Sequence, residues 1–126
     1  MTYQEFFKEF KQKFEGTDVS GISEHLAYQF NIEDKEAGGS FYVEVKGGEL
    51  FIEPYEYYDR DAAFTCKPET LNKIASGKLD PVMAFTLGQL KVEGSIEKAL
   101  HLKEIVEKKK RQEEQSKKKG KGGSKK

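Results

Sequence analysis

Near the start of the chain, the spacing of apolar residues changes from a helical period to strict alternation. An apolar stripe at helical spacing predicts an amphipathic helix over residues 3–15. The stripe consists of Tyr3, Phe7, Phe10 and Phe14. From residue 28 the period becomes two, and segments 28–33 and 41–46 are typical of half-buried strands. The fold must therefore combine helices with a sheet.

A second short helix is predicted between the first helix and the first strand. Gly16 ends the first helix, and Asp18 or Ser20 can cap the next one. Its apolar residues recur at helical spacing and are Val19, Ile22 and Leu26. Two helices are therefore expected before the sheet begins.

Glycine pairs set the order of the first strands. Gly38-Gly39 and Gly47-Gly48 are typical of turns, so the two strands and a third over residues 49 to about 57 are expected to form an antiparallel meander. The third strand carries apolar residues on both faces, and its Pro54 favours an edge or a bulge.

The second half of the chain alternates short helices with strands. A fourth strand is predicted over residues 62–67, followed by a helix that begins at Pro68 and ends at Gly77. Asp80 caps the next helix, a fifth strand covers residues 90–93, and Ser95 caps a last helix. The predicted order is α-α-β-β-β-β-α-α-β-α: an α+β fold with a five-stranded, mainly antiparallel sheet covered by about five helices.

Charge divides the chain into two parts. Residues 1–107 hold 12 basic and 20 acidic side chains, whereas residues 108–126 hold 10 basic and 2 acidic ones. All hydrophobic residues lie in the first part. We expect one domain over residues 1–107 and a Lys-rich tail over residues 108–126 that is largely disordered from about residue 116.

Several protein classes are excluded or disfavoured by composition. No stretch approaches the roughly 18 to 20 apolar residues that span a bilayer, and the N-terminus lacks the features of a secretory signal, so we expect a cytoplasmic protein. One cysteine and two histidines do not make a structural zinc site, and we expect no metal and no cofactor. His25, His101 and Cys66 have no partner at a spacing that indicates a nucleophile and base.

Residues 74–95 carry a family resemblance. The run Ser76-Gly77-Lys78-Leu79-Asp80-Pro81, the following helix with Ala84-Phe85, and Gly88-Gln89-Leu90-Lys91-Val92-Glu93-Gly94 resemble the most recognisable segment of the sterol carrier protein 2 lipid-binding family. Upstream, Asp61-Ala62-Ala63-Phe64-Thr65-Cys66 is similar to a strand of the same family. The resemblance covers roughly residues 18–107.

The resemblance implies a sheet and helices that enclose an apolar tunnel for sterols, fatty acids, acyl-CoA or phospholipids, with no catalytic residues. The nearly all-apolar helix around residues 82–87 agrees with this, because such a helix must be buried or must line something. Of the residues expected to line the tunnel, Met83 and Phe85 matter most for this interpretation. The full set is Phe30, Ile32, Phe51, Leu71, Ile74, Val82, Met83, Phe85, Leu87, Leu90, Leu100 and Ile105.

The expected function is non-enzymatic lipid binding, with a lipid or acyl chain as the partner. The alternative is an accessory or scaffold protein that presents lipid or quinone-type intermediates to biosynthetic enzymes. The Lys-rich tail is a candidate for transient contact with an anionic membrane surface. Nucleic acid is disfavoured because the domain is acidic and the tail has no aromatic residue to stack on bases. A monomer is favoured over an oligomer.

Overall fold

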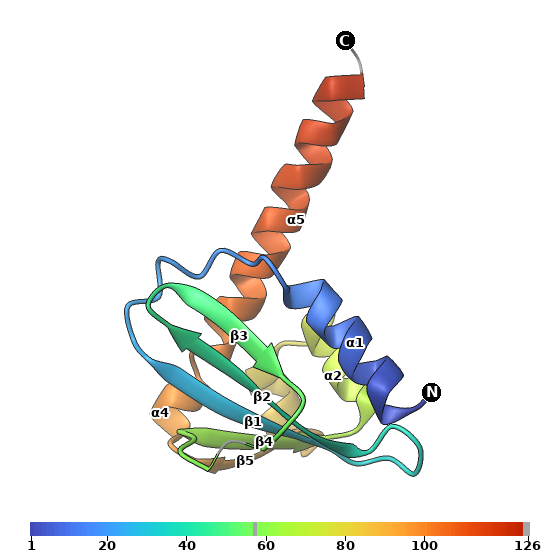
Figure 1. Cartoon of the computed structure of the whole chain (residues 1–126), viewed down its shortest axis with the longest axis vertical. Coiled ribbons are helices and arrows are strands. Elements are labelled where there is room, and N and C mark those ends of the chain that lie inside the picture. Colours follow the sequence, from blue (N-terminus) through green and yellow to red (C-terminus); the bar gives the residue numbers. More distant parts are fainter. Residues whose placement is uncertain (57, 125–126) are drawn as a thin grey trace.

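A single five-stranded sheet with helices packed against it forms the body of the protein (Figure 1). The structure is a computed structural model that describes the backbone of residues 1–56 and 58–124 and the side chains of residues 1–56 and 58–115. In chain order the elements are α1 (Tyr3–Phe14), β1 (Leu26–Ile32), β2 (Gly39–Lys46), β3 (Glu49–Glu53), β4 (Ala62–Cys66), α2 (Pro68–Ala75), α3 (Pro81–Thr86), β5 (Lys91–Gly94), α4 (Ile96–Ala99) and α5 (Leu102–Ser124).

The strand order is β3-β2-β1-β4-β5. The meander is confirmed, because β1 pairs antiparallel with β2, and β2 pairs antiparallel with β3. After β3 the chain crosses to the other side of β1, where β4 runs parallel to β1 and β5 runs antiparallel to β4. The sheet is therefore mixed, with one parallel pairing among three antiparallel ones. β3 ends at Glu53, directly before Pro54, and residue 57 lies outside the described residues.

The helix predicted over residues 3–15 is confirmed as α1, which is capped by Thr2 and Glu5. Its buried rings pack on the sheet: the Phe10 ring centroid lies 4.9 Å from that of Phe41 and 5.8 Å from that of Phe30. Phe30 in turn stacks on Phe41 at 5.3 Å and on Phe64 at 5.1 Å. An aromatic layer thus joins α1 to β1, β2 and β4.

The second helix predicted before the first strand is wrong. Residues 15–25 are irregular, although Val19 and Ile22 are buried as their apolar character requires. Asp18 accepts hydrogen bonds from the backbone N and the hydroxyl of Ser20, so it closes a local turn rather than capping a helix. Leu26, assigned to that helix, instead begins β1 opposite Val45.

The last predicted helix is divided into α4 and α5, with the break at Leu100 and His101. α5 continues to Ser124, past the point near residue 116 from which the sequence suggested disorder (Figure 1). Its first turns pack on the body: Gln112 donates to the Gly16 carbonyl and accepts from the Asp18 amide, each at 2.8 Å. α5 therefore holds the irregular segment 15–25 in place.

Candidate functional site: an apolar pocket between two short helices

An apolar pocket of about 60 Å³ lies where α3, β5 and α4 meet above β4. Its walls carry only apolar side chains, which come from these four elements and from Leu90 and Leu100 next to them. They are Phe64, Pro81, Val82, Phe85, Leu90, Val92, Ile96, Ala99 and Leu100. A site of this kind binds ligand through hydrocarbon burial rather than through hydrogen bonds.

Local sequence signals position the two helices of the pocket, as predicted. The carboxylate of Asp80 accepts from the Val82 amide at 2.7 Å, and Pro81 occupies the first turn of α3. Gly88 follows α3 with a φ of 75°, a left-handed conformation that favours glycine. The Ser95 hydroxyl accepts from the Lys98 amide at 3.1 Å and caps α4. Both helices are therefore short and sharply bounded.

The outer surface of these helices is unusually apolar. α3 buries Pro81 and Ala84 and leaves its larger side chains in solvent. Six large apolar residues of this region are between 43% and 59% exposed, and we refer to them as the α3–α4 apolar patch: Val82, Met83, Phe85, Leu87, Ile96 and Leu100. A group of exposed apolar side chains on neighbouring elements marks an interaction or ligand site.

All but one of the residues expected to line a tunnel fall into three groups. Four of them line the pocket, namely Val82, Phe85, Leu90 and Leu100. Met83 and Leu87 lie on the patch outside the pocket walls. A third group, Phe30, Ile32, Leu71, Ile74 and Ile105, is buried in the main core.

Phe51 is apart from all three groups, because it is 38% exposed on β3, at the opposite edge of the sheet from β5. Sequence reasoning missed Phe64, Pro81, Val92, Ile96 and Ala99 among the pocket residues. Two signals were available: Val92 alternates with Leu90 along one strand, and Ala99 and Leu100 follow Ile96 at helical spacing. A tunnel that runs through the domain remains a prediction.

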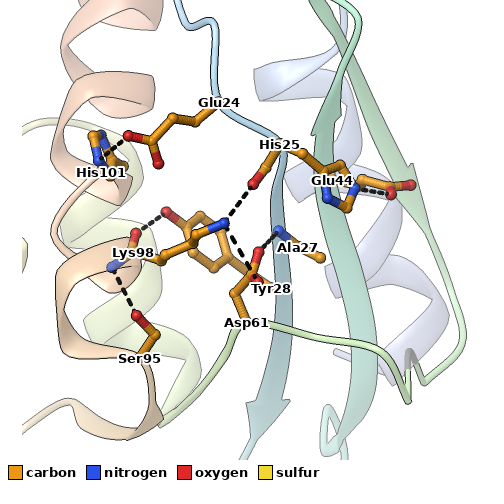
Figure 2. Close-up of polar contacts among 9 residues, drawn as sticks. All are labelled: Glu24, His25, Ala27, Tyr28, Glu44, Asp61, Ser95, Lys98 and His101. Carbon is orange, nitrogen blue, oxygen red and sulfur yellow. Dashed lines mark hydrogen bonds and ion pairs between the residues drawn. The ribbon is translucent and has the colours of Figure 1, made fainter.

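A polar network fixes α4 against the sheet (Figure 2). The buried hydroxyl of Tyr28 on β1 donates to the Lys98 carbonyl at 2.5 Å, while the Lys98 ammonium donates to the His25 carbonyl at 3.2 Å and lies 3.7 Å from the Asp61 carboxylate. Asp61 also accepts from the Ala27 amide at 2.8 Å. Burial, and secondarily the charge of Asp61, raises the pKa of Tyr28. One wall of the pocket is thereby tied to β1.

Both histidines contact carboxylates. The ring of His25 lies 2.6 Å from a Glu44 oxygen, and the ring of His101 lies 2.7 Å from Glu104 and 3.5 Å from Glu24 (Figure 2 shows the contacts with Glu44 and Glu24). The pairs with Glu44 and Glu24 link segment 15–25 to β2 and to the junction of α4 and α5, which gives them a structural role. Neither ring takes part in a hydrogen bond with a serine, threonine or cysteine in the part of the chain with described side chains.

The thiol of Cys66 is buried, and this desolvation, helped by the charge of Glu33, raises its pKa to about 12. It is therefore a neutral packing group at physiological pH. Within the described residues, no cluster of three or more histidine, cysteine, aspartate or glutamate side chains is arranged to hold a metal ion. Across the same residues, no helix combines the length and the apolar character needed to cross a membrane.

The chain matches the model of the SCP-2 sterol transfer family over residues 7–107. It is 39% identical over 77 residues to "Sterol carrier protein 2" of Arabidopsis thaliana, a match that covers 59% of this chain and 63% of the plant protein. It is 34% identical over 80 residues to "Hydroxysteroid dehydrogenase-like protein 2" of Rattus norvegicus, covering 63% of this chain and 15% of the rat protein. The chain thus spans less than two thirds of each relative.

The fold is similar to that in the solution structure of palmitated SCP2L2 from Aedes aegypti. The TM-score is 0.62 at 19% identity, and the match covers 84% of this chain and 95% of the mosquito protein. This likeness concerns the arrangement of the sheet and helices.

Proposed function

Because this chain belongs to the SCP-2 sterol transfer family, a family of lipid-binding domains, we propose that it is a non-enzymatic lipid carrier. It holds the hydrocarbon of a fatty acyl, sterol-like or phospholipid ligand between α3, β5 and α4. The observation that supports this is the apolar pocket between the two short helices, with the α3–α4 apolar patch around it.

Burial of hydrocarbon supplies enough free energy for this role. Each buried methylene contributes about 0.8 kcal/mol, so ten methylenes give roughly 8 kcal/mol before entropy costs, which corresponds to micromolar binding. The pocket of about 60 Å³ is much smaller than the roughly 300 Å³ or more of a typical ligand site. α3 and α4 must therefore move apart on loading, which enlarges the pocket that Val82, Phe85, Ile96 and Leu100 already line.

Native mass spectrometry of the freshly purified protein is the first test, because a co-purified adduct identifies the ligand class. Binding of a fluorescent fatty acid, displaced by palmitate, gives the affinity.

Leu100→Asp is expected to weaken this binding more than tenfold, because it places a charge at the pocket. The variant should still fold, because Leu100 is already half exposed. Tyr55→Asp is the matched control, because Tyr55 is as exposed as Leu100 but lies against Tyr42, at a ring-centroid distance of 5.1 Å, and does not line the pocket. Equal loss in both variants, or no binding by the wild type, would count against the carrier.

The accessory role, presentation of lipid or quinone-type intermediates to enzymes, requires a stable protein partner, so co-purification of such a partner separates it from a free carrier.

The Lys-rich tail adds a contact with anionic membranes. Residues 116–126 hold six lysines and no acidic residue, and each lysine near an anionic surface contributes about 1 kcal/mol. Removing residues 116–126 should weaken vesicle binding at low salt while leaving Gln112 and its contacts in place. Unchanged binding would exclude this role of the tail.

A further inference from the structure

The α3–α4 apolar patch gathers six of the exposed large apolar side chains on two neighbouring short helices and their ends. The apolar stripe of α1 is covered, since Phe6, Phe10 and Phe14 pack into the core. The side chains of the patch are aliphatic, thioether or phenyl groups, so none of them carries a hydrogen-bonding N–H or O–H. Water is therefore an unfavourable neighbour for this face.

Charge distinguishes the segment that carries the patch from the rest of the body. Residues 1–77 hold 8 basic and 15 acidic side chains, whereas residues 78–103 hold 4 basic and 3 acidic ones. The acidic residues of this segment are Asp80, Glu93 and Glu97, and Asp80 is paired with Lys103 at 3.2 Å. An anionic surface repels most of the body but not this face.

We propose that the α3–α4 apolar patch docks the protein on an anionic phospholipid bilayer, with Met83 and Leu87 entering the acyl region and Lys78 and Lys91 at the level of the headgroups. Four of the six patch residues also line the pocket, so a lipid chain passes between bilayer and pocket along apolar side chains. This step rests on the proposed carrier function, because it takes the ligand of the pocket to be lipid.

The size and chemistry of the patch favour a bilayer over a second copy of the chain. A stable dimer buries about 800 Å² and 20 to 30 residues on each side, whereas the patch comprises six residues. Protein interfaces also carry a hydrogen-bonding rim and are enriched in tyrosine, tryptophan and arginine, which are absent from residues 78–103. A bilayer requires only apolar side chains surrounded by cations.

The test is co-sedimentation of the full chain with vesicles of phosphatidylcholine and phosphatidylglycerol in about 1 M salt, where charges are screened within about 3 Å. Under these conditions the Lys-rich tail contributes little and the apolar contact remains. Changing Met83→Ser and Leu87→Ser together is expected to lower the partition coefficient about tenfold, because roughly half of each side chain is available to enter the bilayer. Tyr55→Ser, on the other face of the sheet, is the control and should partition like the wild type.

Three outcomes overturn the docking face: the double variant partitions like the wild type, Tyr55→Ser loses as much binding, or the wild type binds no vesicles and forms a dimer that the double variant dissolves. Circular dichroism of each variant verifies that it is folded. Binding of the fluorescent fatty acid by the wild type is measured separately without vesicles. If vesicles bind through the patch and the fatty acid does not bind, the docking face stands and the carrier function falls.

Discussion

Phe30 and Phe85 are chemically identical and were both expected to line a tunnel, yet they lie in contrasting environments. Phe30 is 1% exposed and stacks between Phe41 and Phe64, with Phe10 also in contact. Phe30→Ala removes the centre of the aromatic layer, and a buried phenylalanine truncated to alanine costs about 3 to 5 kcal/mol. Since a domain of this size is stable by roughly 5 to 15 kcal/mol, this loss is a large part of the total.

Phe85→Ala should instead weaken ligand binding and leave the stability of the fold nearly unchanged. Half of the Phe85 side chain is already in solvent, so its loss removes about half of the burial energy of a phenylalanine, near 1 kcal/mol, and alanine is the better helix former in α3. The same change removes one wall of the pocket. We expect binding of a fluorescent fatty acid to weaken about tenfold while the free energy of unfolding hardly changes.

Urea unfolding followed by far-UV circular dichroism gives the stability of both variants, because the chain has no tryptophan to report on unfolding. A loss of less than about 1.5 kcal/mol in Phe30→Ala would refute the packing argument, since it would mean that this ring faces a cavity rather than a filled core. A loss of 3 kcal/mol or more in Phe85→Ala would show that α3 is core structure and not a movable wall.

Three further predictions concern the supports of the site. Tyr28→Phe removes the hydroxyl that donates to the Lys98 carbonyl and should cost about 1 to 2 kcal/mol in urea unfolding; an unchanged midpoint would contradict the anchoring of α4. Asp80→Ala removes the N-cap of α3 and should cost about 1 kcal/mol at neutral pH. Although partial burial acts to raise the pKa of Asp80, hydrogen bonds from the Val82 amide and Lys103 lower it overall, so its contribution is present above the ordinary carboxyl pKa and is lost as the pH falls through the lower value of the folded state. The stability difference between wild type and Asp80→Ala should therefore shrink at acidic pH, and a difference that grows there would refute the assignment. The Cys66 thiol, with its pKa raised to about 12, should react with iodoacetamide at pH 8 only as fast as the protein unfolds, and reaction at the rate of a free thiol would show that it is accessible.

The parts of the fold that could be predicted are those governed by local chemistry. The helix of residues 3–15, the meander and the caps Asp80 and Ser95 are confirmed, because periodicity, turn glycines and capping groups act over a few residues. The helical spacing of Val19, Ile22 and Leu26 predicts a second helix that the structure does not contain. Tertiary packing overrode that pattern, since Gln112 of α5 satisfies the backbone at both Gly16 and Asp18.

The site was harder to predict because the sequence shows which side chains are hydrophobic but not how deeply each one is buried in the fold. Phe30 and Phe85 look alike in a pattern, and only the sheet order shows that one lies on the central strand and the other on a surface helix. The parallel pairing of β1 with β4, which places Phe64 beneath the pocket, depends on a chain crossing that no local motif encodes.

The place of β5 in the sheet has a kinetic consequence. It is four residues long, pairs with β4 alone and lies along the chain between the two helices of the pocket. Local opening costs least where elements are short and peripheral, so we expect residues 81–100 to be the unit that unfolds sub-globally. The rate of ligand exchange would then follow the opening equilibrium of this segment, and amide hydrogen exchange at residues 91–94 would measure that equilibrium. Substitutions in β5 would then change the rate of ligand exchange, whereas substitutions in the pocket wall would change the affinity for the ligand.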